Sequence, residues 1–542
     1  MANQNKTKKG NFIGRNRLQA VSALVIFVGM LIKMIFLRSR IEAVGTGFYL
    51  TVLTLVMTIT MLLANTLREA VKKAVFYRKS RGQYKNALKI MNTGAVIGAA
   101  AGIVIALILL FTAGRMTAVR LHLGPYGTFP MVVLAASIPF LLSGYGILGC
   151  FDGFSFEVAD GAAKIIFGIS DLLFSLVLVF LACGMGKVHS GLLHDDYVVY
   201  SFGATGAAAG FSGACFVAFI WLIFLFRVFR KRMQSLVNQD TSRSLETFFE
   251  QAAGLFGACG ISFTRFLVLS GTFFINLIFF FKNLKTLDAS TQFGIYLSEN
   301  LLWFLLPVFF TFILGSFTHD YLEKIMKKED IYHAGMRIVM GVKQYLCCVL
   351  PMFVICGIIY PALNESFYKS TVTSPNLPAL LFAVLFGAGL LLCGMLKGIG
   401  NEWIGTICGA AAFVAQTVFV IVLFSKKCDL SALLYGNLIF AFVFFAGCAF
   451  FVGRFCVYKK HLSTNLLMPI VALLALVLSA VLCMLLKDAI GNIPAAAAAI
   501  LLSCIIHAVT LVILGCVREG ELNDFPQGGL LRFAGRLLGI YS

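Results

Sequence analysis

The chain has 542 residues, of which 60% are hydrophobic and 13% charged, and its formal net charge is +20. An ordinary soluble domain is about 45–50% apolar and about 25% charged, so this composition excludes a soluble globular enzyme. In a soluble protein the excess of Lys and Arg would indicate nucleic-acid binding. In a protein with many membrane spans it is typical of the loops that set orientation.

Fourteen stretches are long and apolar enough to cross a bilayer, which needs about 20 mostly apolar residues. Most of the loops between them are short, and none is long and polar enough to form a soluble domain. In chain order the predicted spans are 18–37, 44–66, 91–113, 128–150, 162–184, 198–226, 257–281, 292–316, 338–361, 376–398, 403–424, 431–453, 464–486 and 493–516.

Lys and Arg residues are distributed unequally between the two sets of loops. The loops on the side of the N-terminus, above all 67–90, carry more than twice as many of them as the opposite loops. This asymmetry predicts that both termini are cytoplasmic, and that the 67–90 loop lies as an amphipathic helix on anionic lipid. Once its basic residues are assigned in this way, we expect no nucleic-acid partner.

Chemistry-bearing motifs are missing from the sequence. The 15 Cys residues fall mostly inside apolar runs without metal-ligand spacing, which is typical of buried free thiols. We find no Walker A, HExxH or GxSxG motif in a suitable context. We therefore expect no enzymatic activity, no cofactor and no metal site.

Three sequence anchors recur in the same order and at nearly constant offset, which predicts an internal repeat. Six spans followed by six equivalent spans form a parallel repeat, and transporters use such halves to build a central site that rocks between the membrane faces. The matching segments are Gly47–Leu50 with Gly294–Leu297, Tyr84–Ile90 with Tyr332–Ile338, and Gly149–Gly153 with Gly394–Gly398.

These anchors resemble the multidrug/oligosaccharidyl-lipid/polysaccharide exporter superfamily. The resemblance is to its polysaccharide-biosynthesis branch, which includes stage V sporulation protein B and the MurJ-type lipid II flippases. It is carried by the G-x-G-[LF]-Y element at Gly45–Tyr49, the R-G-[DQ] turn at Arg81–Gln83, and the glycine-rich helix ends at Leu148–Gly153 and Cys393–Gly400. Leu148 stands where the branch has Arg.

The resemblance implies an all-α polytopic membrane protein with a MATE-like two-lobe fold, in which two extra helices follow the 6+6 repeat. It also implies a bacterial cytoplasmic membrane location and a cavity lined mainly by spans 1, 2, 7 and 8. The expected regions are a cytoplasmic basic tail (1–17), the N-lobe (18–226), a cytoplasmic linker (227–256), the C-lobe (257–453), helices 13 and 14 (454–516) and a cytoplasmic tail (517–542).

Four basic residues are candidates for binding an anionic substrate. A diphosphate that crosses the hydrocarbon core needs cationic partners, because its desolvation is costly and Arg or Lys offsets that cost. Lys33, Arg38 and Arg40 lie at the outer half of span 1 or just beyond, and Arg265 lies in its repeat mate, span 7. The alternative for the first three is snorkelling to the outer headgroups.

Two acids and two glycine pairs complete the candidates. Asp171 in span 5 and Glu299 in span 8 could bind a coupling cation or proton, or neutralise a basic neighbour, which for Glu299 would be Lys33 or Arg265. The pairs Gly149/Gly153 and Gly394/Gly398 present small faces that allow helices to pack closely or to bend.

The sequence therefore favours a flippase that moves a lipid-linked saccharide of the undecaprenyl-diphosphate type by alternating access. Its expected partners are that lipid, anionic membrane lipids and envelope-biosynthesis proteins. Two alternatives stay open: a cation-coupled multidrug antiporter of the MATE type, and a non-transporting scaffold for envelope or spore assembly.

Overall fold

The computed structural model describes residues 12–156, 158–232, 237–241, 244–284, 286–326, 331–368, 377–426, 429–455, 467–525 and 528–540. In these ranges every regular element is a helix. The chain divides into two compact units. We call Val21–Leu301 with Gly409–Phe440 the first unit, and Met1–Ala20 with Leu302–Cys408 and Ala441–Ser542 the second unit.

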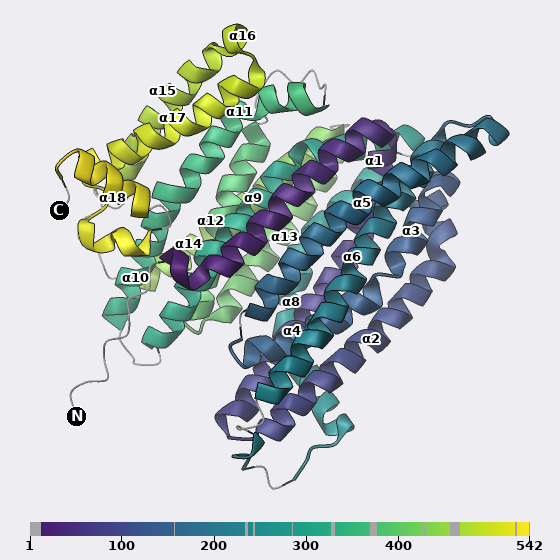
Figure 1. The fold of residues 1–542 in the computed structure, drawn as a ribbon, viewed down its shortest axis with the longest axis horizontal. Helices are drawn as coiled ribbons and strands as arrows, with labels where there is room; N and C mark the ends of the chain where they lie inside the picture. The colour runs from purple at the N-terminus through teal and green to yellow at the C-terminus, as the bar shows by residue number, and fades with distance from the viewer. Residues whose placement is uncertain are drawn as a thin grey trace. The chain divides into compact units, whose positions relative to one another are not determined.

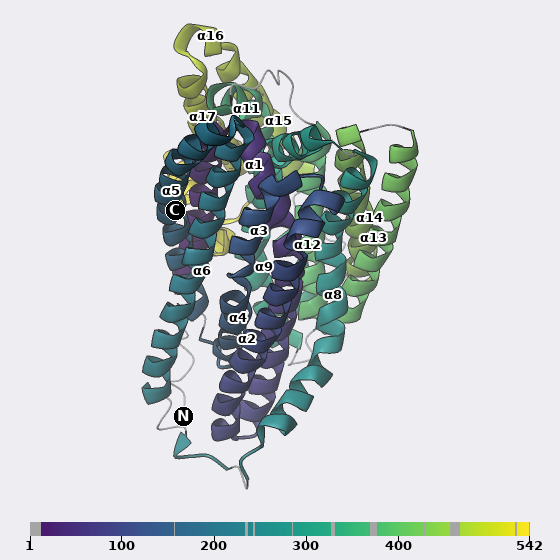
Figure 2. The same cartoon turned by 90° about the vertical axis from the view of Figure 1, so that its right-hand side faces the viewer.

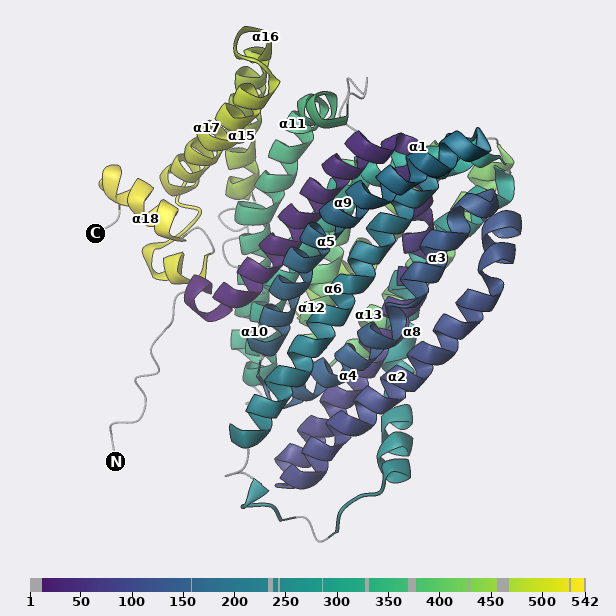
Figure 3. The same cartoon turned by 45° about the vertical axis from the view of Figure 1, so that its right-hand side comes forward.

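The first unit holds α1 from Val21 onward, the other helices of the first half of the chain, parts of α9, α13 and α14, and short helical segments between α2 and α3. Its elements are α1 (Phe12–Ser80), α2 (Tyr84–Arg115), a π-helix (Met116–Arg120), a 3-10 helix (Gly124–Gly127), α3 (Thr128–Ala135), α4 (Ile138–Gly153), α5 (Val158–Leu193), α6 (Tyr197–Arg232), α8 (Phe248–Asn283), α9 (Leu287–Met326), α13 (Glu402–Ser425) and α14 (Asp429–Phe455). Helices α5 and α6 run side by side in all three views (Figures 1, 2 and 3).

Helix α1 is a hairpin of two arms. Lys33 and Tyr49 are 16 residues apart, which is about 24 Å along a straight helix, yet their side chains form a hydrogen bond of 2.9 Å. The chain reverses between them at Glu42, whose positive φ of 55° is unusual for a residue with a side chain. The arms coincide with the first two predicted spans.

Helix α1 also continues past the second predicted span to Ser80, and α2 begins at Tyr84. The stretch 67–90, predicted as a loop that forms one amphipathic helix, therefore consists of two helix ends joined by a short turn. Gly82, with a φ of 74°, occupies the position in this turn that a side chain would strain.

Helix α4 packs against α2 through small residues, and the two helices lie side by side in Figure 2. A Cβ at Gly98 would lie 2.5 Å from the carbonyl oxygen of Leu142, and one at Gly146 would lie 2.7 Å from the carbonyl oxygen of Gly94. Only glycine allows two helix backbones to approach so closely. This contact positions α4 against the centre of the first unit.

The second unit contains the start of α1, the rest of α9, α13 and α14, and the C-terminal elements. These are α10 (Ile331–Gln344), a π-helix (Tyr345–Val349), α11 (Leu350–Tyr368), α12 (Leu377–Gly398), α15 (Met468–Leu485), α16 (Lys487–Ile490), α17 (Asn492–Ile513), a 3-10 helix (Glu519–Asp524) and α18 (Gly528–Leu537). Helices α15 and α17 form a hairpin closed by α16 (Figure 3). Buried His507 joins α17 to its neighbours, because its ring nitrogens lie 3.2 and 3.1 Å from the carbonyl oxygens of Ala472 and Cys347.

Within the described residues, twelve helices are long and apolar enough to cross a membrane. The first of them, Leu18–Ser80, covers two predicted spans, and α9 over the eighth predicted span lies outside that set. The prediction of an all-α polytopic membrane protein is confirmed, whereas the count of fourteen spans stays a prediction. The chain is a multi-pass membrane protein.

Candidate functional site

Lys33 and Asp171, two of the predicted site residues, form a buried ion pair in the first unit. The Lys33 ammonium lies 2.7 Å from Asp171 Oδ1, and only 2% of the Lys33 residue surface is exposed. The ammonium also donates to the Tyr49 hydroxyl and lies 5.0 Å from the centre of the Tyr49 ring. Ser175 donates to the same Asp171 oxygen at 3.3 Å. The Lys33 ammonium thus connects the two arms of α1 with α5.

Arg265 on α8 forms the second buried ion pair of the first unit. Its guanidinium contacts the carboxylate of Glu69 on the second arm of α1, and both residues are buried. Lys73, one helical turn beyond Glu69, lies 3.7 Å from that carboxylate. The sequence analysis had not singled out Glu69, because it falls in the basic 67–90 stretch, just beyond the predicted span 44–66.

The remaining charged candidates lie at less buried positions. Arg38 is half-buried on the first arm of α1, and Arg40 is exposed with its guanidinium 5.7 Å from the centre of the Phe180 ring. Glu299 is half-buried on α9. Of the predicted charged residues, the described contacts therefore join Lys33 to Asp171.

The glycine candidates have different surroundings. A Cβ at Gly149 would lie 2.4 Å from the carbonyl oxygen of Arg68, and one at Gly153 would lie 2.6 Å from the side chain of Val75. Both glycines therefore allow α4 to pack closely on the second arm of α1. A Cβ at Gly394 would meet nothing within 4 Å among the described residues, and Gly398 is buried at the end of α12.

Gly47 and Gly294, which belong to the first pair of predicted sequence anchors, pack against each other. A Cβ at Gly47 would lie 2.3 Å from the carbonyl oxygen of Ser290, and one at Gly294 would lie 2.3 Å from the Gly47 Cα. The second arm of α1 and α9 thus cross in backbone contact at these glycines.

A third polar cluster of the first unit carries no charge, and the sequence analysis missed it. Asn276 on α8 donates to Asn437 on α14 at 2.7 Å, and Gln416 on α13 donates to Asn276 at 3.1 Å. Asn437 donates to the Tyr296 hydroxyl on α9 at 2.8 Å. Single Asn and Gln residues inside apolar runs are the signal that could have found it, since buried amides need partners.

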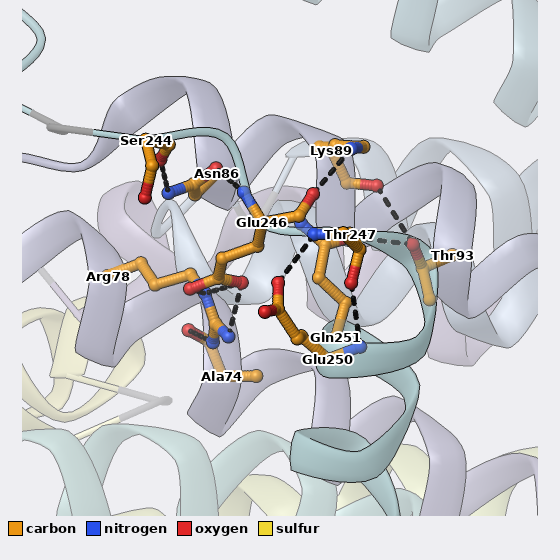
Figure 4. A network of polar contacts seen from close by, with 10 residues as sticks. All are labelled: Ala74, Arg78, Asn86, Lys89, Thr93, Ser244, Glu246, Thr247, Glu250 and Gln251. Atoms are coloured by element: carbon orange, nitrogen blue, oxygen red, sulfur yellow. Dashed lines mark hydrogen bonds and ion pairs between the residues drawn. The ribbon is translucent and has the colours of Figure 1, made fainter.

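The segment before α8 is bound to the ends of α1 and α2 by a linker network, which we define as Arg78, Asn86, Lys89, Thr93, Ser244, Glu246, Thr247, Glu250 and Gln251 (Figure 4). Arg78 donates to both carboxylate oxygens of Glu246 at 2.9 Å. Lys89 donates to the Glu246 carbonyl oxygen at 2.5 Å, and Thr93 donates to Gln251 at 2.6 Å. Figure 4 draws these nine residues together with Ala74, whose carbonyl oxygen accepts a hydrogen bond of 3.2 Å from Arg78.

Helix α8 starts in this network with a capping box. The Thr247 hydroxyl accepts from the Glu250 backbone N–H at 3.3 Å, and the Thr247 backbone N–H donates to the Glu250 carboxylate at 2.7 Å. That backbone donor lowers the pKa of Glu250, which lies outside the membrane-spanning part of α8.

A fourth cluster joins α1, α4 and α5 through charge. Arg68 donates to Asp152 at 2.7 Å and lies 3.0 Å from Asp160, which also pairs with Lys164 at 2.6 Å. Asp152 belongs to the Leu148–Gly153 segment that carries the family resemblance. This contact anchors that segment to α1.

The structure brings together no candidate metal site in the part of the chain that it describes, where no three His, Cys, Asp or Glu side chains are arranged to hold an ion. The described Cys residues are free thiols. The polar contacts described between helices of the first unit include ion pairs and amide hydrogen bonds.

Comparison with solved structures identifies the fold. An inward-facing multidrug resistance MATE family transporter of the MOP superfamily matches with a TM-score of 0.58 and 13% identity, covering 81% of this chain and all of that one. A MOP superfamily transporter from Pyrococcus furiosus, described as having reverse polarity of its binding pocket, matches with a TM-score of 0.56 and 13% identity over 83% of this chain and 99% of that one.

A MATE in complex with the ligand MaL6 has a TM-score of 0.58 and 13% identity, over 82% of this chain and 98% of that one. No family model and no curated protein matches the sequence. The chain thus has the fold of MATE transporters of the MOP superfamily, and the predicted MATE-like fold is confirmed.

Proposed function

We propose that this chain is an exporter that moves a lipid-linked saccharide of the undecaprenyl-diphosphate type across the bacterial cytoplasmic membrane by alternating access. The proposal rests on the fold, which is one of transporters, and on the charges buried in the first unit. Both termini are cytoplasmic in this proposal, and the expected regions keep the boundaries given above.

The observation that carries the proposal is that the buried carboxylates are already paired with basic residues. In the described part of the chain the buried acids are Glu69, Asp160 and Asp171, and each has a Lys or Arg partner. A site for organic cations needs an acid that is available to them. Each of these buried acids, counted together with its basic partners, forms a neutral or net positive cluster, which favours an anionic substrate.

Lys33 has the donor capacity that a phosphate oxygen requires. Two of its three ammonium N–H groups serve Asp171 and Tyr49, which leaves one donor for a ligand. A diphosphate oxygen can also replace the Asp171 carboxylate, because charge-assisted hydrogen bonds to phosphate are of similar strength. Since Lys33 is buried, the substrate reaches it only when the surrounding helices move.

The contact between Gly47 and Gly294 supports such a movement. In the predicted topology both glycines lie at the outer ends of their spans, so that their backbone contact closes the outer end of this helix pair. Outward release then requires α1 and α9 to separate at these residues. We assign to them the role of an outer gate, and to Arg265, Arg38 and Arg40 the role of further substrate contacts.

A second candidate function is cation-coupled multidrug antiport. The same fold supports it, because multidrug resistance MATE transporters share the fold. Buried Asp171 favours it specifically, since a carboxylate released from Lys33 could bind a coupling cation or a cationic drug. Glu299 would be a further acid on that path.

The test is transport by the purified full chain in liposomes. Fluorescent undecaprenyl-diphosphate saccharides are incorporated in one leaflet, and their transfer to the other is followed by dithionite quenching beside uptake of an organic cation such as ethidium. We expect protein-dependent transfer of the lipid and no cation transport. Cation transport without lipid transfer would refute the proposal in favour of the multidrug antiporter. Activity in neither assay would refute it in favour of the non-transporting scaffold.

The matched control variant is Arg115→Gln. Arg115 is an exposed cation at the end of α2, so its loss removes a positive charge without touching the buried pairs. Transfer by this variant is expected to equal that of the natural sequence.

A further inference from the structure

The C-terminal helix α18 has a face that packs on the protein. Its buried residues are Gly528, Leu531, Ala534 and Gly535, and it contacts α17 and the 3-10 helix before it. Figures 1 and 3 show α18 across the ends of α15 and α17, at the end opposite α16. Since α15 and α17 are candidate membrane spans, a helix that crosses their ends runs along the membrane plane.

A second, apolar face of α18 is uncovered. Leu530, Phe533 and Leu537 are 43%, 70% and 73% exposed. Their spacing of three and four residues places them on one side of the helix, away from the buried side. An exposed apolar face of this kind marks an interaction surface.

A basic edge borders this apolar face. Arg532 and Arg536 are one turn apart and therefore share a side of the helix. Arg532 is partly held by a 3.0 Å hydrogen bond to Asn523, and Arg536 is exposed. Protein-facing, apolar and basic sides thus follow one another around α18.

We propose that α18 is an interfacial helix whose Leu530, Phe533 and Leu537 enter the boundary between headgroups and acyl chains, with Arg532 and Arg536 on anionic phospholipid headgroups. An apolar face flanked by Arg is the pattern of helices that lie in this boundary. The bilayer is the occupant because α17, on which α18 packs, already presents lipid-facing side chains such as Leu501, 65% exposed. The same membrane can therefore cover the exposed side of α17 and the apolar face of α18.

An ion pair holds the segment before α18 against the second unit. Lys343 on α10 is buried and lies 2.7 Å from the carboxylate of Glu521, in the 3-10 helix that precedes α18. This pair fixes the start of the C-terminal segment to the second unit. It also neutralises an acid that would otherwise oppose anionic lipid.

The test measures the depth of position 533 in the full chain, reconstituted in vesicles of phosphatidylglycerol and phosphatidylcholine. In a background where Trp221, Trp303 and Trp403 are replaced by Phe, the Phe533→Trp variant reports quenching by lipids brominated at acyl positions 6 and 7. The matched control is Gly520→Trp, because a side chain there has open space around it and lies between Glu519 and Glu521 in the 3-10 helix, outside α18. We expect at least threefold stronger quenching at position 533 than at position 520.

Equal, weak quenching at both positions would overturn the proposal, because α18 would then lie in water or against another protein. The Arg532→Gln/Arg536→Gln double variant tests the headgroup contact separately. Amide hydrogen exchange of residues 529–540 is expected to be several-fold slower with phosphatidylglycerol than with phosphatidylcholine alone, and this difference should vanish in the double variant. An unchanged difference would refute the role of the two arginines. Both experiments compare folded, reconstituted protein, and a double variant that misfolds is recognised by its gel-filtration profile. In that case the single Arg536→Gln variant takes its place.

Discussion

The buried pair of Lys33 and Asp171 predicts a specific pattern of stability in three variants. Asp171→Leu leaves a buried ammonium with the Tyr49 hydroxyl as its described partner. Lys33→Met leaves a buried carboxylate with the Ser175 hydroxyl at 3.3 Å. The double variant Lys33→Met/Asp171→Leu removes both charges and fills the space with apolar groups.

The magnitudes follow from burial. The exposed fractions of the two side chains are 2% and 9%, and their charged atoms are 2.7 Å apart, so neither charge is solvated once its partner is removed. Removal of one member of such a pair costs about 3–5 kcal/mol, whereas replacement of both by apolar residues is neutral or stabilising. We expect each single variant to lose about 3–5 kcal/mol and the double variant to stay within about 1 kcal/mol of the natural sequence.

Equilibrium unfolding in mixed micelles of dodecyl maltoside and sodium dodecyl sulfate measures these differences. The two single variants and the double variant form a double-mutant cycle, and a large coupling free energy is the predicted outcome. The reasoning is refuted by additive effects, in which the double variant loses as much as the two single variants together. A stable Asp171→Leu variant would refute the burial of the charge itself.

Three further predictions concern the glycines, the linker and the C-terminal segment. Gly149→Ala should destabilise the chain in the same assay by about 1–3 kcal/mol, because its Cβ would lie 2.4 Å from a backbone oxygen. Gly394→Ala, with nothing within 4 Å, should be neutral or stabilising by up to about 1 kcal/mol. Equal losses in the two variants would refute the close packing assigned to Gly149. Thr247→Ala should cost about 1 kcal/mol through the lost cap, read as faster amide exchange of residues 247–260. The pKa of Glu250 is lower in the folded chain than in the unfolded chain. The Glu250 carboxylate therefore contributes its full stabilisation above the unfolded pKa near 4.3 and loses it as the pH falls. The effect of Thr247→Ala should accordingly shrink between about pH 5 and pH 3. Burial raises the pKa of Cys516 to about 11, so alkylation of this thiol at pH 8 should be about a hundredfold slower than that of an ordinary cysteine, measured by peptide mass spectrometry; rapid labelling would contradict its burial.

The span pattern could be predicted because bilayer crossing leaves a strong signal in single residues. The apolar runs on either side of Glu42 predicted two helices, and the structure places both inside α1 as a hairpin. The 67–90 stretch was predicted as an amphipathic helix separate from the spans, because its many charges end the apolar pattern, whereas the structure divides it between the end of α1 and the start of α2. Helix continues there because charged residues are good helix formers outside the membrane.

The candidate site was predictable only in part, since a sequence shows which charges lie in spans but not which of them meet. Lys33 and Asp171 are 138 residues apart, and their pairing depends on how α5 packs on α1. Glu69 was missed as the partner of Arg265 because it lies where a span ends. Gln416 and Asn437 were missed because only charged residues within spans were taken as candidates, although a buried amide also needs a partner.

Transfer of a lipid-linked saccharide by the Lys33→Met/Asp171→Leu double variant tests the central claim most directly. This variant is expected to fold and to reconstitute like the natural sequence, so that loss of activity reports on the site and not on stability. If Lys33 binds the diphosphate, liposomes with the natural sequence transfer a fluorescent undecaprenyl-diphosphate saccharide and those with the double variant do not, while Arg115→Gln stays active. Equal transfer by the natural chain and the double variant would contradict the account.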